Sequence, residues 1–227
     1  MMIKITIADL RTLPLSESCE RLLGSLPAEE RKRAERYLRE EDRIRCAAGA
    51  FLMQKSVKNA LAERGAEPVF GIVRTKYGKP YVKEYPDIQL SLSHSGDIIA
   101  LAQYDREIGV DVEQINNIEI DGYMSFMTAG EQRLIKNAPD PLVCFYRVWT
   151  VREAFSKQVG LGLPIFESEK VAIDYEHERI AYRGKTYSVK TFSLDGHIMS
   201  VCVCGNMPEI RRHFIDKTEW ESFFTLP

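Results

Sequence analysis

Apolar side chains recur at two spacings along the chain, and each spacing predicts one kind of element. Residues 1–9 alternate between apolar and polar side chains, which is typical of a β-strand. Residues 41–64 carry apolar side chains at helical spacing, and Gly65 ends that helix. A shorter helix is expected to begin in Ser25-Leu26-Pro27-Ala28-Glu29, because proline and acidic residues favour a first helical turn.

The other predicted elements form two groups in chain order. Strands are predicted at 69–74, 88–94, 98–104 and 108–113. Helical spacing then returns at 120–136 and 141–159, and further strands are predicted at 170–174, 180–182, 186–194 and 198–204. Each half therefore consists of helices followed by an antiparallel meander. This order predicts an α+β fold with two lobes, residues 1–105 and 106–227.

Composition narrows the classes of function. The chain has 227 residues and a net charge of -2, so a nucleic-acid-binding role that relies on an overall positive field is not expected. No apolar run approaches the roughly 18–20 residues of a membrane span, and the first residues lack the pattern of a signal peptide. The five cysteines are scattered without a zinc-site spacing. Reduced thiols in the cytoplasm are the simplest interpretation.

Paired acids mark the strand at 108–113. In Gly109-Val110-Asp111-Val112-Glu113, alternation places Asp111 and Glu113 on one face of the strand. Two carboxylates on one face are suitable ligands for a hard cation such as Mg²⁺, together with substrate phosphates. The same pattern also fits a half-exposed strand whose acids are solvated.

A second group of polar residues lies on the helix at 141–159. Trp149, Glu153 and Lys157 are spaced at i, i+4 and i+8, so they share roughly one helix face. Glu153 could add a third carboxylate to a metal, and Lys157 could bind a phosphate. Glycines after the helix would stop it and allow close backbone approach to a ligand. The alternative is an exposed Glu–Lys pair of little energetic value.

Two further segments carry groups suited to anions. Ser93-His94-Ser95-Gly96 ends a predicted strand and offers hydroxyls, an imidazole and backbone N–H groups, although a single histidine in a turn is more often structural. The second segment is an arginine-rich stretch between residues 31 and 45 that is interleaved with acids. A charge-laced helix face is its default interpretation, and only a subset such as Arg33 and Arg36 has the spacing to converge on a phosphate.

Together these segments resemble the surfactin-type 4′-phosphopantetheinyl transferases. That family carries a G-[IV]-D-[IV]-E strand and, some forty residues later, a W-[ST]-x-K-E-[AS]-x-x-K-x-x-G-x-G-L helix, which match 109–113 and 149–163. Its G-K-P and S-H-S-G segments match Gly78-Lys79-Pro80 and 93–96, and its Glu-Asp-x-x-Arg segment matches 41–45. One position departs from the pattern: Arg152 stands where the family usually has lysine, which keeps the charge but changes the geometry of any contact with the coenzyme.

The resemblance implies two pseudo-equivalent α+β lobes with the active site in the cleft between them. It implies that Asp111, Glu113 and Glu153 hold Mg²⁺, while Lys157 neutralises phosphate oxygens. Glu153 would also accept the proton of the attacking serine. The residues that it implies for binding coenzyme A are Arg33, Arg36, Arg45, Lys79, Pro80, Ser93, His94 and Lys157.

The implied reaction moves the 4′-phosphopantetheine arm of coenzyme A onto a serine of an apo acyl or peptidyl carrier protein and releases 3′,5′-ADP. The carrier would belong to fatty-acid, polyketide or nonribosomal peptide biosynthesis. Two lobes in one chain also predict a monomer. The segment Tyr123 to Glu131, which is rich in methionine and aromatic residues, is expected to contact the carrier, with Phe126 and Met127 as core residues in the opposing interpretation.

Two other functions fit the same residues. One is a Mg²⁺-dependent hydrolase of a nucleotide pyrophosphate, in which the carboxylates would activate water. The other is a module that binds coenzyme A without turnover, although clustered acids are costly to keep without a cation.

Overall fold

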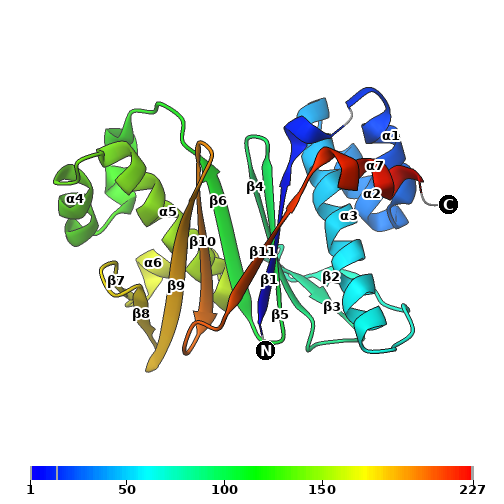
Figure 1. Ribbon diagram of the computed structural model, residues 1–227. Helices are drawn as coiled ribbons and strands as arrows, with labels where there is room; N and C mark the ends of the chain where they lie inside the picture. Colours follow the sequence, from blue (N-terminus) through cyan, green and yellow to red (C-terminus); the bar gives the residue numbers. More distant parts are fainter. Residues whose placement is uncertain (1, 14, 226–227) are drawn as a thin grey trace. The chain divides into compact units, whose positions relative to one another are not determined.

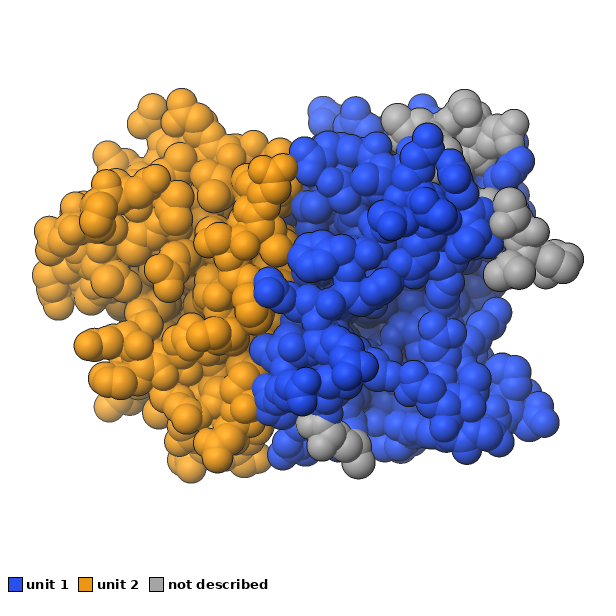
Figure 2. Space-filling view, in the orientation of Figure 1, with its two compact units in different colours: residues 1–106, 208–227 blue, residues 107–207 orange. Residues whose placement is uncertain are grey.

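The computed structural model describes residues 2–13 and 15–225, which form two compact units. Unit 1 contains residues 1–106 and 208–227, and unit 2 contains residues 107–207 (Figure 2). The expected lobes were 1–105 and 106–227; in the structure the chain after residue 207 returns to unit 1, because its strand pairs with the first strand of that unit.

Unit 1 is built on a six-stranded sheet (Figure 1). The strand order is β11-β1-β5-β4-β3-β2, in which β1 and β11 are parallel and the other neighbours are antiparallel. The strands are β1 (Ile3–Asp9), β2 (Ile72–Arg74), β3 (Pro80–Val82), β4 (Gln89–Ser95), β5 (Ile98–Tyr104) and β11 (Ile210–Ile215).

The helices of unit 1 are η1 (Leu10–Thr12), α1 (Leu15–Ser25), α2 (Ala28–Glu35), α3 (Glu40–Glu63) and α7 (Lys217–Thr225). The long helix α3 contributes ten of the 24 buried residues that the structure describes in the core of this unit, and alanines lie among larger apolar residues on its buried face. Gly49 allows α3 to approach the sheet, since an added Cβ would lie 2.9 Å from Leu92 Cδ2. Trp220 of α7 is fully buried against the same core.

Unit 2 has a five-stranded antiparallel sheet in the order β6-β10-β9-β8-β7. Its strands are β6 (Ile108–Gln114), β7 (Ala172–Asp174), β8 (Arg179–Tyr182), β9 (Lys185–Leu194) and β10 (His197–Cys204). Its helices are η2 (Ile120–Phe126), α4 (Ala129–Lys136), α5 (Pro141–Val159) and α6 (Ile165–Ser168). The helix α5 packs on β6 and β10, where Phe155 forms edge contacts with Tyr182 and Tyr187.

The two units share one order of elements. In each, a first strand is followed by a long helix and then by a four-strand meander, and the last strand of the meander pairs antiparallel with the first strand. Thus β1, α3 and β2 to β5 correspond to β6, α5 and β7 to β10. The prediction of an α+β protein with two similar lobes is confirmed.

Most predicted elements are present with small shifts of their ends. The helix predicted at 141–159 has those bounds, since Asp140 caps its first turn and Gly160 ends it at φ 72°. The helix predicted at 120–136 is instead two pieces, η2 and α4, separated at Thr128, whose side chain caps α4. The sequence reasoning missed α1, β3, α6, β11 and α7. No helix in the described part of the chain has the length and apolar character to cross a bilayer.

Candidate active site

The strand β6 and the helix α5 approach each other at Gly109. A Cβ atom at this position would overlap the carbonyl oxygen of Ala154 and the backbone nitrogen of Gln158. Residues of one strand face lie two apart, so Asp111 and Glu113 share the face of Gly109 that α5 covers. The glycine thus permits the short distance at which side chains of the helix reach Asp111.

Asp111 and Lys157 form the central contact of this region. The Nζ of Lys157 lies 2.7 Å from Oδ1 of Asp111, and the Asp111 side chain is only 3% exposed. Both faces of β6 are buried at this point, so the interpretation of Asp111 as a solvated acid is wrong. A buried carboxylate requires a charged or hydrogen-bonding partner, and Lys157 supplies the charge.

Glu153 lies one helical turn before Lys157 and is electrostatically linked to the same pair. Burial raises the pKa of its carboxyl above the ordinary value of 4.5, and the negative charge of Asp111 raises this pKa further. The charge of Lys157 and a hydrogen bond from Ser156 act in the opposite direction. Asp111, Glu153 and Lys157 are therefore brought together as a pair of acids with one base.

Whether this region can bind a divalent cation depends on the carboxylates of Asp111 and Glu153. Among the described residues, no three His, Cys, Asp or Glu side chains are gathered closely enough to hold a metal ion. Glu113 therefore does not join Asp111 and Glu153 in a closed three-residue cluster. Mg²⁺ commonly uses only one or two protein carboxylates and takes its other ligands from water and phosphate. The mutual repulsion of Asp111 and Glu153 is consistent with a pair of that kind.

Sequence reasoning missed a line of buried hydroxyls beside Asp111. Ser200 of β10 is paired across the ladder with Asp111. The Ser200 hydroxyl lies 2.9 Å from the hydroxyls of both Thr150 and Thr191. This chain of hydroxyls joins α5, β10 and β9. Single serines and threonines scattered over fifty residues gave no signal in the sequence.

Arg152 is an internal residue of unit 2. Its side chain is 7% exposed, and Nη1 donates to Oε2 of Glu131 at 2.8 Å. Its guanidinium also stacks over Phe166, 4.0 Å from the ring centroid. Glu131 accepts a further hydrogen bond from the hydroxyl of Tyr175, whose pKa is raised by burial and then by the Glu131 charge. Arg152 therefore connects α5 to α4 and to the segment after β7.

Glu131 also stabilises the start of α4. It forms a capping box with Thr128, in which each side chain accepts a hydrogen bond from the other residue's backbone N–H. One carboxylate thus satisfies a helix terminus, a buried arginine and a tyrosine. A carboxylate with this many partners is fixed in place.

The predicted carrier-binding segment divides into a buried and an exposed part. Met127 is 5% exposed and belongs to the core of unit 2, so the opposing interpretation was right for this residue. Phe126 is 55% exposed. Both residues line a cavity of about 320 Å³ whose wall also includes Trp149, Arg152 and Phe166. Trp149 stacks on Phe145 at 5.9 Å and is held by this aromatic cluster.

The arginines predicted to bind the coenzyme lie in unit 1 and differ in their surroundings. Arg45 is already engaged: Nε donates to the carbonyl of Gly96 at 2.7 Å, and Nη1 lies 2.5 Å from Asp42. It ties α3 to the turn between β4 and β5. Arg33 is more exposed and has a long contact of 3.9 Å with Glu30. Arg36 is an exposed residue at the end of α2.

The other predicted coenzyme residues of unit 1 lie on strands β3 and β4 and on the turn before β3. Ser93 and His94 belong to β4, which extends to Ser95, so the turn begins later than predicted. His94 is exposed and Ser93 is buried. Lys79 follows the turn at Gly78, and the buried Pro80 opens β3.

Comparison with known proteins identifies relatives of both units. A profile described as the 4′-phosphopantetheinyl transferase superfamily matches residues 107–202, and one described as 4′-phosphopantetheinyl transferase, N-terminal, matches residues 13–106. The chain is 34% identical to a 4′-phosphopantetheinyl transferase of Bacillus subtilis over 155 residues, which cover 67% of this chain and 68% of that protein.

Two further relatives match over a longer span. One is the 4′-phosphopantetheinyl transferase Sfp of Bacillus subtilis strain 168, with 28% identity over 83% of this chain and 87% of the relative. The other is the 4′-phosphopantetheinyl transferase psf-1 of Bacillus pumilus, with 29% identity over 86% of this chain and 84% of the relative.

Proposed function

The chain belongs to the 4′-phosphopantetheinyl transferase superfamily and is a transferase, and on this premise we propose that its donor is coenzyme A and its acceptor a serine of an apo acyl or peptidyl carrier protein. The observation that carries the proposal is the grouping of Asp111, Glu153 and Lys157 where β6 meets α5. The residues match the acid and base positions of the family pattern.

In the proposed reaction, the serine oxygen of the carrier forms a bond to the β-phosphorus of coenzyme A. The bond from this phosphorus to the bridging oxygen breaks, and 3′,5′-ADP leaves with that oxygen. Glu153 accepts the serine proton, directly or through one water molecule. Its raised pKa supports this role, because a more basic carboxylate is a better proton acceptor. Lys157 neutralises charge on the phosphate oxygens.

We propose that Asp111 and Glu153 hold Mg²⁺, with Glu113 on the same strand face as a further oxygen donor. When bound, the ion would neutralise charge on the pyrophosphate. Lys157 then has two tasks: it balances the charge of Asp111 before the substrate binds, and its ammonium group is a donor for an incoming phosphate. The protein's own contribution is mainly positioning and charge stabilisation.

We extend the proposal to the cationic residues of unit 1. Arg33, Arg36 and Lys79 would bind the nucleotide end of coenzyme A, including its 3′-phosphate, and His94 with Ser93 its phosphate chain. The exposure of Arg36 and His94 and the partial exposure of Arg33 support this assignment. Arg45 and Pro80 would shape the site from behind: Arg45 holds the turn at Gly96 through a hydrogen bond, and Pro80 is buried.

The test mixes the chain with coenzyme A, Mg²⁺ and apo carrier proteins of several pathways. Mass spectrometry should show a phosphopantetheine increment on a carrier serine, together with release of 3′,5′-ADP. Glu153→Gln should abolish the increment, whereas Glu176→Gln, an exposed acid in the same unit, should not. Release of 3′,5′-ADP without a carrier would indicate a hydrolase instead. Tight binding of coenzyme A without any product would indicate a binding module.

Two further arms of the same assay address the remaining parts of the proposal. Dephospho-coenzyme A should bind at least about tenfold more weakly than coenzyme A if Arg33 and Arg36 contact the 3′-phosphate, since a charge-assisted contact is lost. Equal affinities would remove these arginines from the site. Sedimentation of the active chain should give a monomer, in keeping with the proposal that no partner subunit is needed.

A further inference from the structure

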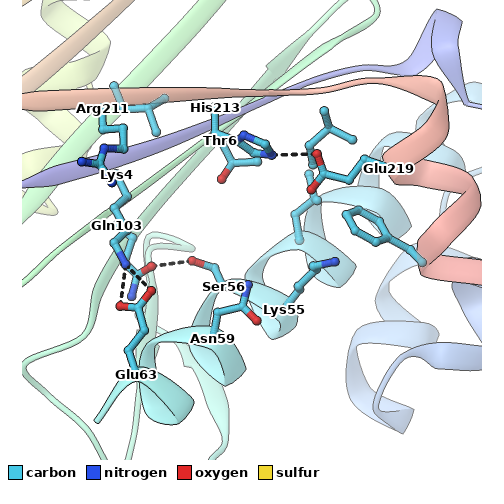
Figure 3. A pocket seen from close by; sticks show the side chains of 14 residues that line it. Lys4, Thr6, Lys55, Ser56, Asn59, Glu63, Gln103, Arg211, His213 and Glu219 are labelled. Atoms are coloured by element: carbon cyan, nitrogen blue, oxygen red, sulfur yellow. Dashed lines mark hydrogen bonds and ion pairs between the residues drawn. The ribbon is translucent and has the colours of Figure 1, made fainter. Parts of the chain in front are cut away.

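Each unit fixes its long helix to its sheet by the same two contacts. In unit 1, the carboxylate of Glu63 on α3 accepts from the Nζ of Lys4 on β1 at 2.8 and 2.6 Å (Figure 3). The hydroxyl of Ser56 on α3 donates to Oε1 of Gln103 on β5 at 2.7 Å. Lys4 and Gln103 are directly opposite each other in the ladder of β1 and β5. Ser56 and Glu63, at positions i and i+7 of the helix, therefore reach one pair of opposed strand residues.

Unit 2 repeats this arrangement at the candidate active site, with the charges exchanged. Lys157 of α5 lies 2.7 Å from Asp111 of β6, and the hydroxyl of Thr150 lies 2.9 Å from that of Ser200 on β10. Asp111 and Ser200 are again directly opposite each other in their ladder, and Thr150 and Lys157 again occupy positions i and i+7. The hydroxyl contact of α5 thus has a counterpart in unit 1 and belongs to a frame that both units share.

The helix residue at position i+3 lies between the two contacts and differs between the units. In unit 1 it is Asn59, which lines a cavity of about 220 Å³ together with Ser56 and Glu63 (Figure 3). In unit 2 it is Glu153, whose carboxyl interacts electrostatically with Asp111. The same frame therefore holds a neutral amide in one unit and the proposed proton acceptor in the other.

The hydroxyl contact of unit 2 has a fixed direction. The Thr150 hydroxyl donates its single proton to the carbonyl oxygen of Arg147 at 3.2 Å, so Ser200 is the donor in the contact with Thr150. Thr191 lies 2.9 Å from Ser200 and donates to it in turn. Thr150 and Ser200 are fully buried, so loss of either partner leaves a buried polar group unsatisfied. The contact is neutral, and its last proton is committed to α5.

The charged contact and the hydroxyl contact respond differently to a substrate. In the proposed reaction Asp111 gains a metal ion as a partner and Lys157 gains a phosphate, so their attraction to each other is shared with new ligands. Thr150 and Ser200 gain no ligand in that reaction, and their hydrogen bond involves no ionised group. The hydroxyl contact is therefore the one that still holds the middle of α5 on the sheet when the substrate is bound.

We propose that Thr150 and Ser200 are positioning residues of the transfer reaction, which keep Glu153 in place beside Asp111 while Lys157 engages the phosphate. The inference rests on the proposed function, because it concerns the step in which Glu153 accepts the serine proton. Both hydroxyls act through α5, since Thr150 and Glu153 are one helical turn apart. A misplacement of about 1 Å is enough to slow a reaction by about a hundredfold.

Steady-state transfer kinetics of matched variants test this assignment. Thr150→Val removes the hydroxyl contact of unit 2 with little change of shape, and Ser56→Ala removes its counterpart in unit 1. Thr150→Val should lower kcat at least about tenfold with little change in the KM for coenzyme A. Ser56→Ala should leave both constants unchanged. Thr150→Ser keeps the hydroxyl and should stay within about threefold of the wild-type kcat.

Three results of these assays would overturn the proposal. They are a wild-type kcat in Thr150→Val, an equal fall of kcat in Ser56→Ala, and a Thr150→Ser variant as slow as Thr150→Val. The last two would mean that a general loss of packing explains the data. If Thr150→Val does not fold, Ser200→Ala breaks the same contact from the strand, and the same criteria apply to it.

Amide hydrogen exchange tests the positioning without a carrier and without turnover. In a Lys157→Met chain, which lacks the charged contact, adding Thr150→Val should accelerate exchange at Glu153 and Ala154 at least about tenfold. Adding Thr150→Ser should not. Equal exchange with and without Thr150→Val would overturn the positioning role even in a chain that transfers phosphopantetheine. Accelerated exchange together with a wild-type chain that transfers nothing would overturn the proposed function and uphold the hold of this contact on α5.

Discussion

The Nζ of Lys157 lies 2.7 Å from Oδ1 of Asp111, which joins the last turn of α5 to the middle of β6. The lysine side chain is 30% exposed and the aspartate side chain 3% exposed, so the pair has a buried and a solvent-facing end. One contact therefore serves both the packing of the helix on the strand and the charge of the proposed site. Stability and activity are linked at this point.

Asp111→Ala should abolish transfer and also lower the free energy of unfolding by about 1–3 kcal/mol, because Lys157 loses its acceptor. Urea unfolding measures the loss, and a double-mutant cycle with Lys157→Met isolates the pair. Additive effects on stability, with no coupling energy, would contradict an energetic role for the contact.

Gly109→Ala should destabilise unit 2 by about 1–3 kcal/mol or more, because the added methyl overlaps the backbone of α5. The helix must move away from β6, so transfer should fall as well. Thermal unfolding measures the first effect and the carrier assay the second. Gly122→Ala is the control, since a Cβ there meets nothing within 4 Å and stability should stay within about 0.5 kcal/mol.

Arg152→Met should cost about 3–5 kcal/mol of stability, because it leaves Glu131 buried without its charged partner. Coenzyme A affinity in the folded protein should be unchanged. Arg147→Met, on an exposed part of the same helix, should have little effect on unfolding. A stable Arg152→Met variant that no longer binds coenzyme A would show instead that Arg152 contacts the substrate.

Phe126→Ser and Met127→Ala should separate docking from packing. Phe126 is exposed, so its replacement should raise the KM for the carrier while the melting temperature hardly changes. Met127 is buried, so its truncation should cost about 2–5 kcal/mol. An unchanged KM in Phe126→Ser would remove this segment from the carrier surface.

Glu153→Gln should stabilise the protein at neutral pH. Because the folded-state pKa of Glu153 is raised, the free energy of unfolding falls as pH rises from the ordinary value of 4.5 through the folded-state pKa. The amide removes this penalty, so its benefit should be greatest at neutral pH and disappear near pH 4.5. Melting temperatures of both proteins across this range provide the measurement. A lower melting temperature for Glu153→Gln at neutral pH would mean that attraction to Lys157 outweighs burial.

Local patterns predicted the elements of the site well. The helix α5 has a capping aspartate, a proline at its start and a glycine at its end, all of which act within a few residues. The alternation of β6 placed Asp111 and Glu113 on one face, as the structure has them. The resemblance then supplied roles that spacing alone left open.

Burial and distant pairing could not be predicted in the same way. Asp111 is buried because α5 covers the face that alternation had made polar. Arg152 is buried against Glu131, which lies about twenty residues earlier and also accepts a hydrogen bond from Tyr175, about twenty residues later. The strand β11 has four consecutive exposed residues, so no alternation marks it. Each of these features depends on segments that meet only in the folded chain.

The parallel pairing of β1 with β11 bears on how the protein is made. Ile3 is aligned with Ile210, so more than two hundred residues must leave the ribosome before this edge of β1 gains its neighbour. All of unit 2 is synthesised in between, and its own sheet needs nothing beyond residue 207. During synthesis unit 2 can therefore finish folding first, although it starts later. Unit 1 meanwhile keeps an open strand edge, the part of a nascent protein most prone to mispairing, until its final segment arrives.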